Sequence, residues 1–289
     1  IATSMTDLSA LRRLNRRISS VSAIVYFREN QFAYPDRAKL VLVERQLTGI
    51  YSALSADTVV FNSRFNRESF LQGTGEFLRK MPDGVPAGVC EKIKGKSICL
   101  PVAVDLFESN ARRVPGSIVW NHRWEHDKGL KLLLEIVSGL IAAGVEFQFN
   151  LLGQKFRQIP NEISQLIDLL RYHDRILRVS FIESEAVYIN VLKETQIVLS
   201  TSSQEFQGLV VQDALAQGYL TVVPDDLRYP EYVPDVYRYN SVVEAVQIIK
   251  WVIAGDLKEK VDPSGFGWSA VGDRWLALIY DLVRQRELI

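Results

Sequence analysis

Two carboxylates lie on either side of the turn between a predicted strand and a predicted helix in the second half of the chain. Glu205 lies just before the predicted helix Leu209–Ala216 and Asp213 lies within it, while Gly208 directly precedes it. A helix that begins at a glycine leaves its first backbone N–H groups without side-chain partners, so they are free to bind an anion. Carboxylates beside an anion site accept hydrogen bonds from hydroxyl groups. The pattern therefore indicates a site for a nucleotide-sugar, with the diphosphate at the start of the helix.

A cationic segment follows an earlier apolar strand, Ser117–Trp120. Arg123 and Lys128 lie between this strand and the predicted helix Leu130–Ala143. Arginine offers a planar fork and lysine a compact charge, and both bind phosphate. A diphosphate gains negative charge when its sugar leaves, so cations held there lower the barrier to transfer. We therefore predict that Arg123, Lys128 and Glu205 are catalytic; the alternative is a solvated turn whose tryptophans pack the core.

Composition restricts the other classes of function. Basic and acidic residues are equal in number, 34 each, so no overall field attracts nucleic acid and such a partner must use a local patch. No run approaches the roughly 20 apolar residues that cross a bilayer. Cys90 and Cys99 are too few for a disulfide framework, and His122 and His126 lie in a predicted loop without a third metal ligand. We predict a cytoplasmic protein without a membrane segment, a metal or a cofactor.

Apolar runs of strand length alternate with helical patterns along the chain, which predicts parallel sheets joined by right-handed crossovers. The predicted strands are 23–27, 58–61, 97–100, 117–120, 147–152, 177–181, 197–200 and 219–223. The predicted helices are 8–17, 37–54, 65–79, 130–143, 162–172, 185–195, 209–216, 242–254 and 268–287.

The polar, aperiodic stretch Pro101–Pro115 divides these elements into two series. We therefore predict an α/β protein of two doubly wound, Rossmann-like domains, residues 1–107 and 108–289. They would face each other across a cleft in which ligands bind beyond the carboxyl ends of the strands. The last helix could extend back across the hinge. Ile1–Ser4 have the pattern of the tail of a strand, so we expect the first domain to be incomplete at its start; the pattern predicts no oligomeric state.

A basic edge is predicted on the first helix, 8–17. Its arginines lie at positions i, i+1, i+4 and i+5, while leucines of the same helix would face inward; the arginines are Arg12, Arg13, Arg16 and Arg17. Such an edge could contact RNA phosphates, and each contact would steepen the salt dependence of binding. The alternative is an ordinary solvated helix face.

Several stretches resemble a known family: Ala2–Leu8, Glu29–Pro35, Ala56–Ser63, Trp120–Gly129 and Tyr229–Glu231. The second and fourth of these are the most specific. The chain resembles the two-domain GT-B glycosyltransferases, and in particular the tRNA-queuosine mannosyltransferase family, from its first residues to about residue 231. The resemblance implies a retaining transfer of mannose from GDP-mannose, without metal, to the queuosine base of a tRNA anticodon.

The resemblance also assigns residues to the two substrates. Glu205 would contact sugar hydroxyls, Asp213 the ribose diol, and Thr201 the phosphate or the sugar. Other residues of the donor site would be Phe206, Gly208 and Leu209. Residues expected to contact the sugar or to lie on the acceptor side are Arg28, Glu29, Asn30, Gln31, Asn62 and Ser63.

Four positions depart from the family's pattern: Arg28, Gln204, Gln207 and Asp213. Arg28 stands where the pattern has His, Asp213 stands where the second acid is normally Glu, and His-Glu-Phe-Phe-Gly is replaced by Gln204–Gly208. Changes grouped around one pocket predict altered specificity. A GT-B glycosyltransferase with another donor or acceptor therefore stays open as an alternative, as does a nucleotide-sugar-binding or RNA-binding protein that has lost turnover.

Overall fold

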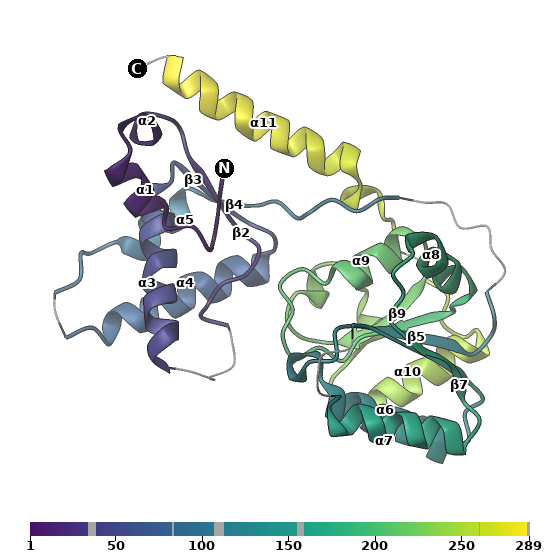
Figure 1. Cartoon of the computed structure of the whole chain (residues 1–289). Coiled ribbons are helices and arrows are strands. Elements are labelled where there is room, and N and C mark those ends of the chain that lie inside the picture. Colours follow the sequence, from purple (N-terminus) through teal and green to yellow (C-terminus); the bar gives the residue numbers. More distant parts are fainter. Residues whose placement is uncertain (34–38, 83, 107–112, 155–158, 260, 288–289) are drawn as a thin grey trace. The chain divides into compact units, whose positions relative to one another are not determined.

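The computed structural model describes residues 1–33, 39–82, 84–106, 113–154, 159–259 and 261–287. It divides into two compact units, one of residues 1–103 with 268–289 and the other of residues 104–267 (Figure 1). Each unit contains one parallel sheet covered by helices, as the alternation of strands and helices predicts. Within the described ranges, no helix is long and apolar enough to cross a membrane.

The first unit is built on a four-stranded sheet in the order β1-β2-β3-β4. The strands are β1 (Ala2–Thr3), β2 (Ile24–Phe27), β3 (Thr58–Phe61) and β4 (Ser97–Cys99). The helices are α1 (Leu8–Leu14), α2 (Arg16–Ser19), α3 (Lys39–Ser55), α4 (Arg64–Arg79), α5 (Val89–Gly95) and α11 (Trp268–Glu287). Phe27 and Phe61 lie opposite each other in the register of β2 and β3 and pack against Phe70 of α4 in one core.

The last helix, α11, covers the other face of this sheet (yellow in Figure 1). Alternate residues of a strand point to opposite faces, so Ile24 and Val60 lie away from the phenylalanine core. They pack with Leu100 against Trp275, Leu278 and Leu282 of α11. The ring of Trp275 meets Tyr26 edge-on, with centroids 5.4 Å apart.

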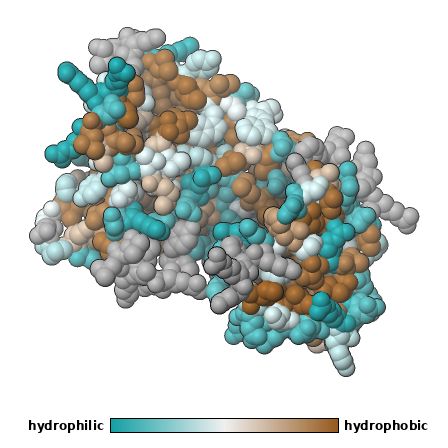
Figure 2. Space-filling model, in the orientation of Figure 1, coloured by the Kyte–Doolittle hydropathy of each residue, from teal (hydrophilic) through white to brown (hydrophobic). Residues whose placement is uncertain are grey.

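The sequence-based division ended the first domain at residue 107 and counted the last helix in the second domain, although it also expected that this helix could extend back across the hinge. In the structure this helix belongs with the first unit, because the uninterrupted apolar runs of β2 and β3 have two faces to bury. A second apolar stripe of α11 stays exposed at Leu276, Ile279, Tyr280 and Val283. Hydrophobic residues (brown) gather accordingly near the top of Figure 2, where Figure 1 places α11.

The second unit has a six-stranded parallel sheet in the order β10-β9-β8-β5-β6-β7. The strands are β5 (Ser117–Asn121), β6 (Gln148–Leu152), β7 (Ile176–Ser180), β8 (Ile197–Leu199), β9 (Leu220–Pro224) and β10 (Arg238–Tyr239). The helices are α6 (Leu130–Ala142), α7 (Asn161–Tyr172), α8 (Glu185–Glu194), α9 (Leu209–Ala216) and α10 (Val242–Ala254). Figure 1 shows α6, α7 and α10 on one face of the sheet and α8 and α9 on the other.

The chain changes direction at the centre of this sheet. It runs outward from β5 through β6 to β7 and then returns to β8, which pairs with the opposite side of β5. Crossovers therefore leave β5 and β8 toward different faces, and in sheets of this type ligands bind beyond the carboxyl ends of two such strands. The two segments that contain the predicted catalytic residues, 121–129 and 200–208, follow these two strands.

Two local predictions need correction. The helix predicted at 8–17 is wrong as a single element, because the side-chain oxygen of Asn15 accepts hydrogen bonds from the backbone N–H groups of Arg17 (3.0 Å) and Ile18 (3.3 Å) and starts a new helix. Helix α5 was not predicted. It buries only Val89 and Ile93, which is too short a pattern to show helical periodicity.

We expect Trp275→Ala to lower the free energy of unfolding by about 2 kcal/mol, because it removes a half-buried ring that covers the open face of the first sheet. Urea unfolding followed by circular dichroism would measure this change. Tyr280→Ala on the exposed stripe of the same helix is the matched control and should shift stability by no more than about 0.5 kcal/mol. Equal effects of both substitutions would contradict the packing described for α11.

Candidate functional site

Backbone and side-chain hydrogen bonds hold together the two loops that follow β5 and β8. The backbone N–H of Ser203 donates to the carbonyl of Asp127 (2.9 Å). The hydroxyl of Thr201 accepts from Trp120 Nε1 (3.0 Å) and donates to the carbonyl of Lys128 (2.8 Å). The loops therefore present their side chains from one surface at the carboxyl edge of the sheet.

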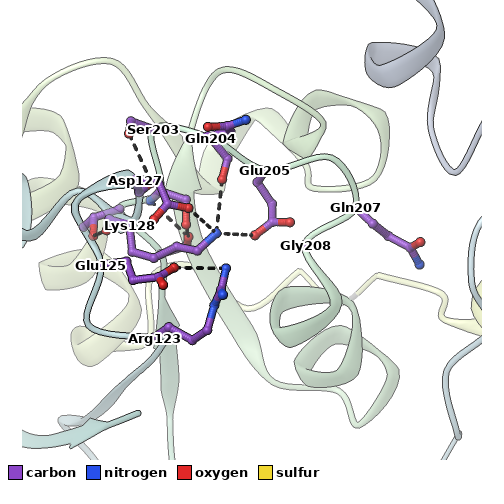
Figure 3. A network of polar contacts seen from close by, with 12 residues as sticks. Arg123, Glu125, Asp127, Lys128, Ser203, Gln204, Glu205, Gln207 and Gly208 are labelled. Carbon is purple, nitrogen blue, oxygen red and sulfur yellow. Dashed lines mark hydrogen bonds and ion pairs between the residues drawn. The ribbon is translucent and has the colours of Figure 1, made fainter. Parts of the chain in front are cut away.

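Lys128 lies at the centre of this surface and joins both loops (Figure 3). Its Nζ lies 3.4 Å from Glu205 Oε2, 3.2 Å from Asp127 Oδ2 and 3.2 Å from the carbonyl oxygen of Gln204. Only 9% of Lys128 is exposed, so the two carboxylates compensate a charge that has lost most of its water. The structure thus brings together Lys128 and Glu205, which are 77 residues apart in the sequence.

Arg123 comes from the same loop as Lys128 but is more accessible. Its side chain is 56% exposed, and Nη2 lies 3.1 Å from Glu125 Oε2. An exposed ion pair contributes little to stability, so this guanidinium can exchange its partner for an anionic ligand at low cost.

Three helices of the second unit begin at this edge without a side-chain cap: α6, α9 and α7, which begins after Pro160. Gly129 (φ 67°) precedes α6 and Gly208 (φ 71°) precedes α9, whereas serines cap α8 and α10. A Cβ on Gly129 would lie 1.8 Å from the carbonyl oxygen of Thr201, and one on Gly208 would lie 2.5 Å from the hydroxyl of Tyr232. Only glycine fits at either position, and both helix N-termini stay open to bind an anion.

Asp213 lies in α9, partly buried. Burial raises the pKa of its carboxyl from 3.8 to about 6, and the charge of Asp105 adds to the effect. The hydroxyl of Tyr188 accepts a hydrogen bond from Asn121 Nδ2 at the end of β5 (2.9 Å). Burial, and next the charge of Asp213, raise the pKa of Tyr188 to about 12. Asp213 is therefore a carboxyl group whose charge depends on pH near neutrality.

The other predicted donor residues differ in their accessibility. Thr201 is 1% exposed and its hydroxyl is engaged on both sides, so in this structure it positions Lys128 rather than facing a ligand. Phe206 is buried, at 6% exposed, whereas Leu209 in the first turn of α9 is 43% exposed.

Three residues expected on the acceptor side form a buried network in the first unit instead. Asn62 Nδ2 donates to the carbonyl of Arg28 (2.8 Å), and its Oδ1 accepts from Asn66 Nδ2 (2.8 Å). Asn30 Nδ2 donates to Asn66 Oδ1 (2.8 Å), and the Ser63 hydroxyl caps α4. These side chains tie the loops after β2 and β3 together. Sequence analysis missed Asn66, which connects them and is fully buried.

The remaining first-unit residues are more open. Arg28 is exposed, while Glu29 and Gln31 are partly buried. Glu29, Asn30 and Gln31 line one small pocket with Arg45 and Gln46. Residues 34–38, which include the end of the Glu29–Pro35 stretch, lie outside the described residues.

The predicted basic edge is wrong in two respects. Arg12 faces the body of the first unit, where its guanidinium donates to the carbonyls of Ser55 and Val21 and lies 3.3 Å from Asp57 Oδ2. Of the leucines expected to face inward, Leu8 is buried in the core, but Leu11 is 41% and Leu14 84% exposed. Arg13, Arg16 and Arg17 do lie on the surface around the break between α1 and α2.

No three His, Cys, Asp or Glu side chains group as metal ligands within the described ranges. His122 is 6% exposed, and burial, followed by the charge of Lys128, lowers its pKa to about 3. It is therefore neutral at physiological pH. Function without a metal stays a prediction.

Sequence analysis missed several residues that support the site. Asp127 binds Lys128 from within the specific 120–129 run. Tyr229 and Tyr239 hydrogen-bond Ser200, each at 2.8 Å, and Tyr232 donates to the carbonyl of Gln207 (3.2 Å). The clustering of tyrosines after β9 was the available signal, because buried hydroxyls need partners.

The family described as tRNA-queuosine alpha-mannosyltransferase N-terminal matches residues 1–104. The tRNA-queuosine alpha-mannosyltransferase of Drosophila melanogaster is 33% identical over 254 residues, which cover 83% of this chain and 67% of that protein.

Solved glycosyltransferase structures resemble the whole chain at lower identity. TarM of S. aureus has a TM-score of 0.68 at 14% identity, over 94% of this chain and 53% of that one. The lipopolysaccharide outer core galactosyltransferase WaaB has a TM-score of 0.62 at 13% identity, over 95% of this chain and 79% of that one. This chain thus spans about half the length of TarM, and the likeness shows a GT-B fold. Together with the Drosophila match, it shows that the chain belongs to the tRNA-queuosine alpha-mannosyltransferase family of GT-B glycosyltransferases.

Proposed function

We propose that this protein transfers mannose from GDP-mannose to queuosine in tRNA, with retention at the anomeric carbon. The observation that carries the proposal is the Lys128–Glu205 pair beside the uncapped N-termini of α6 and α9. Positive charge for a diphosphate and a carboxylate for sugar hydroxyls meet at one edge of the sheet. The family relationship supplies the identity of the sugar and the acceptor.

The diphosphate would lie across the two helix N-termini, with Lys128 and Arg123 as its counter-charges. During transfer, the bond between the anomeric carbon and the phosphate oxygen breaks, and its electron pair stays on that oxygen. The acceptor hydroxyl forms the new bond, and its proton passes to the departing phosphate on the same face. Lys128 and Arg123 stabilise the charge that develops on the phosphate, so the proposal includes neither a metal nor a cofactor.

The two carboxylates have separate tasks in this proposal. Lys128 fixes the orientation of Glu205, leaving its other oxygen for hydroxyls of the transferred sugar. Asp213 accepts hydrogen bonds from the ribose diol, which requires its ionised form. Its shorter side chain limits its reach compared with the glutamate that the family pattern has at this position.

The acceptor binds through phosphates as well as through the modified base. Arg13, Arg16 and Arg17 are the exposed cations that support this part of the proposal. A protein with no net charge needs such a local patch to hold RNA.

Calorimetric titration with GDP, UDP, GDP-mannose and UDP-glucose tests the donor. We expect a preference for GDP and GDP-mannose. Glu205→Gln should remove most of the affinity that the mannose adds, about tenfold or more, because a charged acceptor for its hydroxyls is lost. Glu135→Gln in the exposed part of α6 is the matched control and should change nothing. A UDP preference would favour the GT-B alternative with another donor.

Donor affinity should fall as pH falls through about 6, the pKa to which burial raises Asp213. Between pH 7.5 and pH 5 we expect a loss of up to about tenfold, because the protonated carboxyl accepts poorly from the ribose diol. The contribution of Asp213 to folding has the opposite sign. Its folded pKa exceeds the unfolded value of 3.8, so this contribution is present below pH 3.8 and is lost as pH rises through about 6.

Titrations at several pH values, with parallel unfolding curves, therefore separate a change at the site from a loss of folding. Asp213→Asn should flatten both profiles around pH 6. His122 contributes nothing in this range because its pKa is near 3. An unchanged pH profile in Asp213→Asn would contradict the role given to this carboxyl.

Replacing Arg13, Arg16 and Arg17 together by Gln should weaken tRNA binding and reduce the slope of log affinity against log salt by about 2 to 3, with GDP affinity unchanged. Fluorescence anisotropy with labelled tRNA across a salt series measures both quantities. The control replaces Arg79, Lys92 and Lys94, exposed cations of α4 and α5, and removes the same charge. Equal losses in the two triple variants would mean that only overall charge matters, and that α1 and α2 do not form the tRNA surface.

A further inference from the structure

Two glutamines flank Glu205, and both depart from the pattern of the family. Gln207 is engaged within the protein: its side-chain amide lies 2.8 Å from that of Gln212, and its carbonyl accepts from Arg228 Nη1 (3.3 Å). Gln212 in turn lies 3.0 Å from Arg228 Nη2. Gln207 therefore belongs to a buried network that supports the start of α9.

Gln204 is buried without such a network. It is 5% exposed, yet neither Oε1 nor Nε2 of its side chain has a hydrogen-bond partner in the described part of the chain. Burying an amide without partners costs free energy, because its bonds to water are lost and not replaced. Folded proteins rarely leave a side-chain amide in this state unless something else binds there.

The position of Gln204 relates it to the donor site. Its backbone carbonyl accepts from Lys128 Nζ (3.2 Å), and the next residue is Glu205. Figure 3 shows the side chain of Gln204 pointing away from Lys128 Nζ. At the end of the neighbouring strand β5, His122 is a second buried side chain with an unpartnered atom, Nε2. Each of the two loops thus holds a buried polar side chain with an unpartnered atom at this edge of the sheet.

We propose that the side-chain amide of Gln204 binds a hydroxyl group of the transferred sugar and so determines which sugar the site accepts. The proposal rests on the proposed function, since it takes the donor to be a nucleotide-sugar. A carboxamide donates through Nε2 and accepts through Oε1, which matches a hydroxyl group that does both. A diphosphate only accepts, and its place is on the Lys128 side of this segment.

A sugar whose hydroxyl pairs with this amide gains more binding free energy than a hydrogen bond exposed to water would give. The folded chain has already removed the Gln204 amide from water, and this costs free energy. A correctly placed hydroxyl offsets that cost by forming hydrogen bonds with the amide, whereas a sugar without that hydroxyl leaves the amide unpaired. Discrimination by Gln204 is therefore strongest against stereoisomers that move one hydroxyl.

Gln204→Met tests the proposal, because methionine has a similar length and no hydrogen-bonding amide. We expect the ligand-free variant to unfold at an equal or higher temperature, since an unpaired amide has been removed. GDP should bind as it does to the unchanged chain. The additional affinity of GDP-mannose over GDP should fall about tenfold, the value of one recovered hydrogen bond. Gln217→Met, at the far end of α9, is the matched control for a buried glutamine and should leave this increment intact.

The proposal would be overturned if Gln204→Met kept the full additional affinity of GDP-mannose over GDP. A loss of stability in this variant would also overturn it, because that would indicate an internal partner or a buried water for the amide. Gln204→His, which retains one donor and one acceptor, should recover part of the increment in a correctly folded chain. Failure of the proposed function looks different: the unchanged chain would then show no preference for GDP-mannose. If it prefers another nucleotide-sugar, the same comparison is made with that donor and its nucleotide.

Discussion

The close approach of Gly129 to the Thr201 carbonyl is the contact on which the site depends. Because glycine has no Cβ, α6 can begin directly against the loop that follows β8. The Thr201 hydroxyl then reaches the Lys128 carbonyl and fixes the backbone that carries the lysine. This packing lets Lys128 reach Glu205 on the other loop. A side chain at position 129 would separate the loops and, with them, the cation from the carboxylate.

Charge is balanced within this small region. Lys128 is buried, and Glu205, Asp127 and the Gln204 carbonyl are acceptors for its three N–H groups. Uncapped helix N-termini add positive potential without adding an ionisable group. Asp213 is less compensated, because its burial is accompanied by Asp105 rather than by a cation. The site thus has a well-paired centre for the diphosphate and a flanking carboxyl group that responds to pH.

The two units use polar residues differently at their strand ends. In the second unit, Gln204, His122 and Arg123 leave hydrogen-bonding capacity for a ligand. In the first, the capacity of Asn30, Asn62 and Asn66 is used internally, and their network fixes the loops after β2 and β3. Polar residues after the end of a parallel strand can therefore either keep unpartnered atoms or hold a loop in place.

The sequence by itself determined the α/β class, almost all of the strands and most helices, because buried parallel strands are continuous apolar runs and the helices between them are amphipathic. It also singled out Glu205 and Lys128, which the structure brings together, since both stand after strand ends where parallel sheets bind ligands, but it did not single out Asp127. Short elements such as α5 and the break at Asn15 escaped it, because a helix of one or two turns has too little periodicity to detect.

Only the tertiary structure decided which polar groups remain available. Thr201, Asn62 and Arg12 were all candidate ligand contacts in the sequence, but each has a hydrogen-bond partner 34 or more residues away in the chain. The position of α11 was also decided by the tertiary structure. This helix packs on the first sheet because one face of that sheet is apolar and otherwise uncovered, which the sequence of the helix does not show. Residue type and spacing specify which hydrogen bonds and ion pairs a side chain can form. Long-range packing decides whether its partner is another part of the protein or a ligand.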